Sequence, residues 1–406
     1  MNSPPAAVVS PKTNWPAVLA AVLCGVAVAM NVGKVSIAMP HLRSEFHLSL
    51  VAAGWVSSMI NTMAVATGLF FGLLGDRIGA LKMCFAGLLV SALGGTGALI
   101  ASGETALLLS RFAEGVGLVS VAVSAPALLS AASSPADRRF ALGIWSSYMP
   151  AGVGLVMLLA PLMMHLSGWR GVWLASLAVV LLAALAIHRC RQAYHLPVRI
   201  AAKSHPLTTA KEALAQPVPW LLAIAMGCWT LQHFALIIWL PTFLREQRDL
   251  SPIVVSLLSC LMVLVNVPGN LIGGSLLQRH FKRGNLIAFA SLVTGLSGVG
   301  IFLDVLPDLL RYALCLTLSF AGGLIPASVL SASASFARTP QQIGTLQGLF
   351  MQCGNLGPFI GPPLIAMLVA ASGLWRDALW VTGAAAVAGG VLGLVVRRYE
   401  GVQKGP

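Results

Sequence analysis

Long apolar runs separated by short polar segments set the pattern of this chain. Each run is long enough for a helix that crosses the hydrocarbon core of a bilayer, which takes about 20 mostly apolar residues. The alternation of apolar and polar residues that is typical of a membrane β-barrel strand does not occur in them. We therefore predict an all-α membrane protein with twelve transmembrane helices, at 17–40, 51–74, 83–101, 105–132, 140–166, 171–188, 219–240, 253–277, 285–303, 309–335, 342–370 and 378–396.

The composition supports a membrane protein and excludes several other classes. Of the 406 residues, 57% are hydrophobic and 9% are charged, whereas a soluble domain carries roughly 25% charged residues. A soluble enzyme is therefore excluded, and the scattered Lys and Arg form no basic stripe for a nucleic acid despite a net charge of +13. No metal-ligand cluster, nucleophile–base pair or phosphate-binding loop occurs, so we expect no enzymatic activity, no cofactor and no metal site.

Lysine and arginine are distributed unevenly between the two sets of loops. If the N-terminus is cytoplasmic, the cytoplasmic segments hold 17 of these residues and the outer loops hold five. The positive-inside rule then predicts that both termini are cytoplasmic. The predicted domains are a cytoplasmic N-terminal tail (1–16), a six-helix half (17–188), a cytoplasmic linker (189–218), a second six-helix half (219–396) and a cytoplasmic tail (397–406).

The two predicted halves resemble each other at an offset of about 200 residues. Pro126 corresponds to Pro326, and Arg111 corresponds to Arg311, each at an offset of 200. Other weak matches follow in the same order, so we interpret the halves as an internal repeat. Two repeated six-helix halves in a membrane imply a substrate site between them, near the middle of the bilayer.

The segment between the second and third predicted helices reads GLLGDRIGALK, residues 72–82. It resembles the G-x-x-x-D-R-x-G-R/K signature of the major facilitator superfamily of secondary transporters, with Ala80 at the expected basic position. Helix count, repeat and linker extend this resemblance over nearly the whole chain. It implies a fold of two pseudo-symmetric six-helix halves that work by alternating access. Within the family it most loosely resembles the cyanate and nitrate permease branch.

The resemblance also implies a cytoplasmic gate at this segment. Asp76 is expected to meet the positive end of a neighbouring helix and hold the cytoplasmic side shut in one state. In the second repeat Gln278 stands at the corresponding position, so the two gates are expected to differ. The alternative is a tight turn whose charges only set the topology. The candidate gating residues are Gly72, Gly75, Asp76, Arg77, Gly79 and Lys82.

Lys34 lies inside the first predicted helix, and Asn31 shares its helix face three residues earlier. An ionisable group at membrane depth is a candidate functional residue, so we expect this pair to line a substrate cavity. The alternative is that Lys34 extends its ammonium group to the outer interface. Drug exporters of the family often carry an acid where this chain has Asn31, which favours an anionic substrate over a cationic one.

Arg111 and Glu114 lie on one face of the fourth predicted helix, three residues apart. They resemble the family's R-x-x-x-G motif. We predict a proton-linked switch in which protonation of Glu114 releases Arg111; the alternative is a permanent structural ion pair. With Lys34, these residues leave one net positive charge in the N-terminal half, which a small anion would balance. Arg311, in contrast, is expected to form an interfacial ion pair near Asp304 and Asp308.

Uncharged polar residues inside the predicted helices complete the candidate site. Most of them share helix faces in the C-terminal half and are expected to form a polar cavity wall, although each could be an ordinary hydrogen bond between helices. His233 is the second candidate for proton coupling. These substrate-site candidates are Asn61, Tyr148, Trp229, Gln232, His233, Asn266, Asn270, Gln347 and Asn355, in addition to Asn31, Lys34 and Arg111.

These observations together predict a secondary active transporter. We expect proton-coupled uptake of a small anion through the cytoplasmic (inner) membrane of a bacterium by a monomer whose partners are the substrate, protons and lipid. The alternative is a proton antiporter that exports a drug or siderophore-like compound. A receptor without transport activity would need a large polar domain, which this sequence does not contain.

Overall fold

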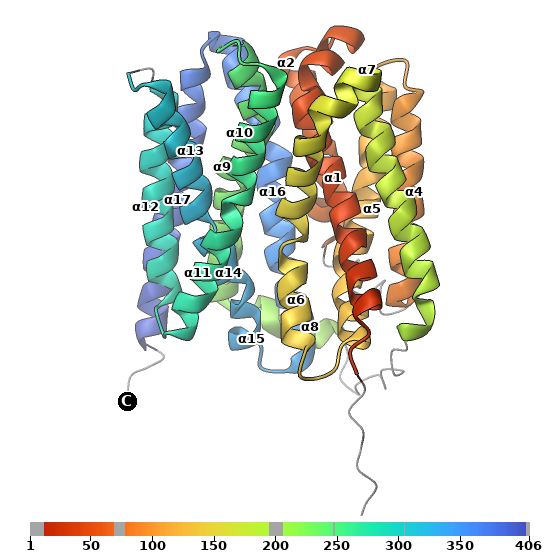
Figure 1. Cartoon of the computed structure of the whole chain (residues 1–406). Coiled ribbons are helices and arrows are strands. Elements are labelled where there is room, and N and C mark those ends of the chain that lie inside the picture. The colour runs from red at the N-terminus through yellow and green to blue at the C-terminus, as the bar shows by residue number, and fades with distance from the viewer. Residues whose placement is uncertain (1–11, 69–77, 195–205, 247, 304, 403–406) are drawn as a thin grey trace, which may run out of the picture.

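The computed structural model describes residues 12–68, 78–194, 206–246, 248–303 and 305–402. These residues form helices and contain no strand. The long helices run side by side, and α1 begins on the same face of the bundle on which α17 ends (Figure 1). We call this the terminal face and the other end of the bundle the opposite face. The prediction of an all-α helical bundle is confirmed.

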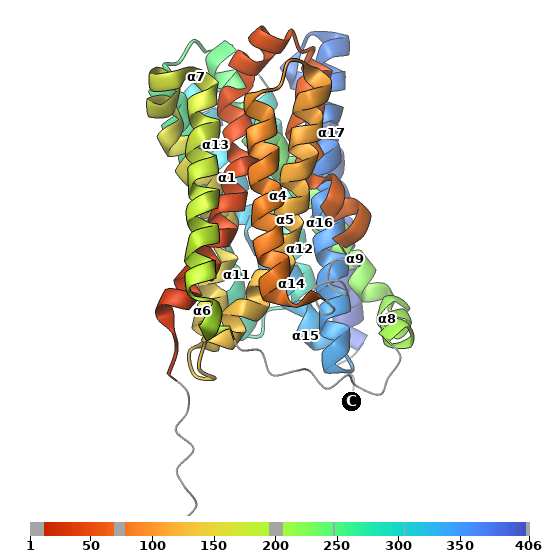
Figure 2. The ribbon, with the colours of Figure 1, turned by 90° about the vertical axis from the view of Figure 1, so that its right-hand side faces the viewer.

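The N-terminal half consists of helices that pack closely on one another. Helix α4 packs along α5, and α7 packs along α1; Figure 2 shows α4 and α5 standing next to each other. The elements are α1 (Trp15–Phe46), α2 (Leu50–Ser58), η1 (Met59–Asn61), α4 (Ala80–Leu99), α5 (Glu104–Ala132), α6 (Arg138–Ser146), α7 (Tyr148–Arg189) and η2 (Arg191–Ala193).

Helix α7 contains two membrane-spanning segments rather than one. Its 42 residues measure about 63 Å at 1.5 Å per residue, twice the thickness of a bilayer core. The backbone leaves the helical conformation at Ser167 and at Gly168, which has a φ of 61°. Glycine adopts such a φ at little cost, so the chain reverses here. The described residues contain 11 helices long and apolar enough to span a membrane, and α7 supplies the twelfth predicted segment.

The C-terminal half repeats this arrangement, with α9 packed along α16 and α12 along α13. A further helix, α8 (Pro206–Leu214), lies within the predicted linker. The other elements are α9 (Pro217–Glu246), α10 (Pro252–Leu264), α11 (Asn266–Gln278), α12 (Arg283–Phe302), α13 (Asp308–Gly322), α14 (Leu324–Leu330), α15 (Ala332–Phe336), α16 (Pro340–Ser372), η3 (Trp375–Asp377) and α17 (Ala378–Val402).

Four predicted continuous helices are interrupted in the structure. The segment 51–74 contains the 3-10 turn η1, and the segment 140–166 is divided at Ser147 into α6 and α7. The segment 253–277 is divided at Val265 into α10 and α11, and the segment 309–335 is divided at Gly323 and again after α14. Pro268 and Pro326 each follow the first break by three residues. Proline lacks an N–H and its ring collides with the carbonyl four residues earlier, which here is the last residue of α10 or α13.

The outward faces of four helices carry exposed apolar side chains. Examples are Leu93 on α4, Leu181 on α7, Leu292 on α12 and Val387 on α17, each more than half exposed. A soluble protein rarely exposes apolar surface on this scale, whereas a bilayer covers it. Together with the apolar helices, these side chains identify an integral membrane protein.

The two halves contact each other through α1 with α9, α2 with α16 and α7 with α10. Near the opposite face, Arg43 Nη1 lies 2.9 Å from Glu246 Oε1. Deeper in the bundle, Gln352 Nε2 donates to the carbonyl of Val65 at 2.6 Å. The halves therefore meet along a seam that reaches from the opposite face into the interior of the bundle.

Candidate functional site

Two helices of the N-terminal half bring three charged side chains together. Lys34 on α1 places its Nζ 2.5 Å from Glu114 Oε1 on α5, although the two residues are 80 positions apart. Arg111, one turn before Glu114 on α5, pairs through Nη1 with the second carboxylate oxygen, Oε2. All three side chains are at most 1% exposed. We call Lys34, Arg111 and Glu114 the charged cluster.

Neutral groups accept further hydrogen bonds from the two cations. Asn31 Oδ1 accepts from Lys34 Nζ at 2.7 Å, and Asn31 Nδ2 donates to Ser91 Oγ on α4 at 3.0 Å. Arg111 Nε donates to the carbonyl of Val56 at 3.2 Å, and its Nη1 donates to the carbonyl of Asn31 at 2.8 Å. The predicted pairing of Asn31 with Lys34 is present, and it belongs to a network that joins α1, α2, α4 and α5.

Small residues and one aromatic ring enclose the charged cluster. The ring centroid of Trp173, on the second segment of α7, lies 4.6 Å from Lys34 Nζ, which gives a cation–π contact. A Cβ at Gly94 would lie 2.8 Å from Glu114 N, and one at Gly115 would lie 2.3 Å from the carbonyl oxygen of Ile60. Glycine at these positions lets α4 and η1 approach α5 closely enough to seal the cluster from solvent.

The charged cluster carries an excess of positive charge. Two cations share one carboxylate, and Arg111 Nη2 has no hydrogen-bond partner among the described residues. Burying an unbalanced charge in a medium of low dielectric is costly unless a counter-ion is supplied. In this conformation Lys34 does not reach an interface, because its amine is bound to Glu114 and Asn31 inside the bundle.

The C-terminal half has an uncharged counterpart on α9, α11 and α13. His233 Nε2 lies 2.9 Å from Ser319 Oγ, and the His233 ring stacks on Trp229 at 4.6 Å between centroids. Asn266 Nδ2 donates to the carbonyl of Ser319 at 2.7 Å, and Asn270 Nδ2 donates to Asn266 Oδ1 at 2.7 Å. We call Trp229, His233, Asn266, Asn270 and Ser319 the neutral cluster.

The other predicted substrate-site residues do not join either cluster. Their contacts are mainly local: a hydrogen bond to the preceding turn for three of them, a ring stack for Tyr148 and hydrogen bonds to α14 and α15 for Gln347. The single predicted cavity wall in the C-terminal half is therefore divided in the structure. These separate residues are Asn61, Tyr148, Gln232, Gln347 and Asn355.

The predicted gate lies largely outside the described residues, which end at 68 and resume at 78. Gly72, Gly75, Asp76 and Arg77 are not described. Lys82 lies in the first turn of α4, and Gly79 precedes that helix with a φ of 91°. This left-handed conformation favours glycine, in agreement with the turn expected at Gly79.

Sequence reasoning missed Ser91, Trp173 and Ser319, each of which completes a cluster from another helix. A single serine or tryptophan in an apolar run does not indicate which residue on another helix it will contact. The Lys34–Glu114 pair was also missed, because spacing along a helix identifies only neighbours on the same helix.

The fold and the sequence both match known membrane transporters. A solved structure with a similar fold is a bacterial homolog of the human lysosomal transporter Spinster, in an inward-facing and unoccupied conformation. It has a TM-score of 0.77 and 16% sequence identity, and the match covers 94% of this chain and 96% of that one. The same homolog in an inward-facing, occupied conformation matches equally well.

Curated relatives align over most of their length. A Bacillus subtilis (strain 168) protein named "Putative niacin/nicotinamide transporter NiaP" is 27% identical over 364 residues, covering 84% of this chain and 85% of the relative. A Cupriavidus necator protein named "Probable sulfoacetate transporter SauU" is 23% identical, covering 89% of each chain. The 2-nitroimidazole transporter of Escherichia coli (strain K12) is 24% identical, covering 89% of this chain and 90% of the relative. The sequence profile of the Major Facilitator Superfamily matches residues 21–362, and this chain therefore belongs to that family of membrane transporters.

Proposed function

We propose that this transporter moves a small organic anion by alternating access, coupled to protons in the direction of uptake. The observation that carries the proposal is the buried charged cluster, in which two cations share the single carboxylate of Glu114. Such an excess of buried positive charge is offset when an anion binds near it. Arg111 Nη2, which lacks a partner among the described residues, is the donor that we assign to that anion.

The names of several relatives support an anionic substrate. Besides the sulfoacetate transporter, they include a hexuronate transporter of Bacillus subtilis, which is 20% identical and covers 93% of each chain. Sulfoacetate and hexuronate are both small acids that carry carboxylate groups. A guanidinium group matches the geometry of a carboxylate, to which it donates two parallel hydrogen bonds.

Proton coupling follows from the position of Glu114 between the two cations. A proton on Glu114 removes the negative charge that holds Lys34 and Arg111, so the cluster then attracts an anion more strongly. By linkage, a bound anion favours the proton to the same extent. Anion and proton therefore bind together, which is the requirement for symport.

The orientation and domain division remain part of this proposal. We place the terminal face in the cytoplasm, because the Lys and Arg residues favour that side. The cytoplasmic membrane of a bacterium, a monomeric state and a linker between two domains stay predictions, as does the gate at Asp76.

Counterflow in proteoliposomes tests the substrate class. Purified protein is reconstituted and loaded in turn with small carboxylates and sulfonates, neutral solutes and organic cations. We expect trans-stimulated exchange with anions alone; exchange confined to neutral or cationic solutes would refute the proposal.

The same vesicles test proton coupling. Glu114→Gln mimics the protonated carboxyl, so exchange should survive while accumulation driven by a pH gradient is lost. Uphill accumulation by Glu114→Gln would remove Glu114 from the coupling role.

A further inference from the structure

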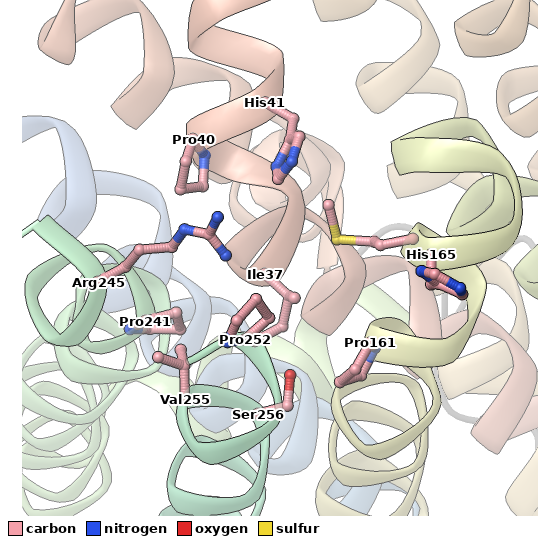
Figure 3. Close-up of a pocket in the computed structure, with 11 residues that line it drawn as sticks. Ile37, Pro40, His41, Pro161, His165, Pro241, Arg245, Pro252, Val255 and Ser256 are labelled. Atoms are coloured by element: carbon pink, nitrogen blue, oxygen red, sulfur yellow. The ribbon is translucent and has the colours of Figure 1, made fainter. Parts of the chain in front are cut away.

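A separate cavity of about 220 Å³ lies toward the opposite face, at the seam between the two halves. Helices α1 and α7 line it from the N-terminal half, and α9 and α10 line it from the C-terminal half (Figure 3). The charged cluster does not contribute to its walls, so this cavity is distinct from the site described above.

The polar groups at the top of this cavity are basic. Arg245 of α9 and His41 of α1 both line it, and Figure 3 shows their side chains turned toward the same space. His165 of α7 lies at its edge. No Asp or Glu is among the lining residues. A concave surface with charge of one sign raises the local concentration of ligands of the opposite sign, because low-dielectric walls concentrate the field.

Two acidic side chains on neighbouring helix ends, Glu246 and Glu45, are engaged elsewhere. Glu246 pairs with Arg43 at 2.9 Å, and Glu45 pairs with Arg170 at 2.7 Å while also accepting from Trp169 Nε1 at 2.6 Å. Arg245 has neither an ion pair nor a hydrogen bond among the described residues. Its guanidinium group is therefore available to an anion in the cavity.

The floor of the cavity presents a buried hydroxyl group without a partner. Ser256 on α10 is 1% exposed, and its Oγ makes no hydrogen bond among the described residues. Its oxygen is directed toward the space below Ile37 and Pro252 (Figure 3). Leaving a buried hydroxyl group without a hydrogen bond costs free energy, which is recovered when a ligand accepts a hydrogen bond from it. The apolar walls at Ile37 and Pro252 suit the hydrocarbon part of such a ligand.

We propose that this cavity is a recruitment site for small organic anions, which bind their carboxylate or sulfonate group between Arg245, His41 and Ser256. A volume of about 220 Å³ is below the roughly 300–1,000 Å³ of pockets for drug-sized ligands, so the site suits a small solute. The identification of this anion as the cargo rests on the proposed function. The anion preference of the cavity rests on its own lining residues.

Charge-selective modification of an introduced thiol tests the recruitment site. Ser256→Cys is purified, and its reaction rates with sulfonatoethyl and trimethylammonioethyl methanethiosulfonate are measured by mass spectrometry of the peptide. Each rate is divided by that of a free thiol with the same reagent. We expect the anionic reagent to react about tenfold faster, and Arg245→Gln in the same background should reduce this ratio toward one. Arg376→Gln, an exposed arginine outside the cavity lining, is the matched control and should leave the ratio unchanged.

Three results would overturn the proposal: equal normalised rates, a ratio that Arg245→Gln does not alter, or no reaction with either reagent. If Ser256→Cys fails to fold, Val255→Cys provides a thiol at the neighbouring lining position. The assay needs no transport substrate, so its outcome is separate from counterflow. If the anionic reagent reacts faster as expected but counterflow shows transport of neutral solutes alone, the proposed function is refuted and the proposal of an anion site in the cavity still holds.

Discussion

The charged cluster and the neutral cluster occupy related places in the two halves. In the N-terminal half, α1 and α5 supply Lys34 and Glu114; in the C-terminal half, α9 and α13 supply His233 and Ser319. Lys34 and His233 are 199 positions apart, close to the offset of the predicted repeat. The charged cluster thus buries three formal charges, whereas the neutral cluster buries hydrogen bonds between uncharged groups. This difference suggests that protons and anions act on the N-terminal half while the C-terminal half provides shape and polar contacts.

The repeated arginines show the same difference. Arg111 is fully buried and bound to Glu114. Arg311 lies near the opposite face, where its Nε donates to the carbonyl of Ile301 at 2.8 Å and its Nη1 lies 3.8 Å from the exposed Asp308. The predicted interfacial ion pair of Arg311 with Asp308 is confirmed, while Asp304 lies outside the described residues. Asp308, the ion-pair partner of Arg311, is 65% exposed and can be hydrated, whereas the Arg111–Glu114 pair is enclosed on both sides.

The largest effect is expected when the charged cluster loses its only carboxylate. Glu114→Leu leaves Lys34 and Arg111 buried without a counter-charge, a situation that costs about 3–5 kcal/mol. Thermal unfolding of the purified protein in detergent should show a large drop in midpoint temperature. The double variant Lys34→Met/Glu114→Leu retains one unbalanced cation, as the native cluster does, and should recover part of the loss. An unchanged midpoint in Glu114→Leu would contradict the buried triad.

The next effect concerns anion affinity at Lys34. Lys34→Met leaves the Arg111–Glu114 pair electrically neutral, so half-saturation of counterflow should require at least tenfold more anion, about 1.4 kcal/mol. Lys34→Arg keeps the charge but presents a planar group under Trp173, and it should retain part of the affinity. Normal anion affinity in Lys34→Met would show that the excess positive charge of the charged cluster does not contribute to substrate binding.

The predicted gates offer a second pair to compare. Asp76→Asn keeps the side-chain shape and loses the charge, so it should weaken a contact with a helix end that is worth roughly 1 kcal/mol. Transport rates in proteoliposomes should fall about fivefold while membrane insertion is unchanged. Gln278→Asn, at the corresponding place in the second repeat, is the control and should transport normally. Equal rates in all three proteins would favour a turn that only sets the topology.

The sequence was sufficient to predict the segments that cross the bilayer. Apolar length alone separated the predicted helices 140–166 and 171–188, and the break within α7 falls between them at Gly168. The breaks at Val265 and Gly323 were not predicted, since each lies inside an apolar run. Their cause, a proline three residues later, is a local backbone effect that hydropathy does not record.

The candidate site was predictable only within each helix. Spacing of three residues placed Asn31 beside Lys34 and Arg111 beside Glu114, and the structure shows both pairs. The contact between Lys34 and Glu114 depends on how α1 and α5 pack, which no spacing along the chain determines. For the same reason, the cavity lined by Arg245 joins four helices from two halves and has no linear signature.

The smallest effects are expected in the neutral cluster. Ser319→Ala removes the hydroxyl that binds His233, and hydrogen bonds between membrane helices contribute about 0.6 kcal/mol on average. The unfolding midpoint should therefore shift only slightly, as it should for the control Asn270→Ala, which breaks the bond to Asn266.

The last prediction concerns the charge of His233. We expect His233 to stay uncharged throughout the transport cycle, because its ring is stacked on Trp229 and bound to a neutral hydroxyl group. His233→Gln should then leave the pH dependence of uptake unchanged, whereas Glu114→Gln should abolish it. If His233→Gln instead removes the pH dependence, the coupling proton belongs to the C-terminal half, and the contrast between the two clusters is reversed.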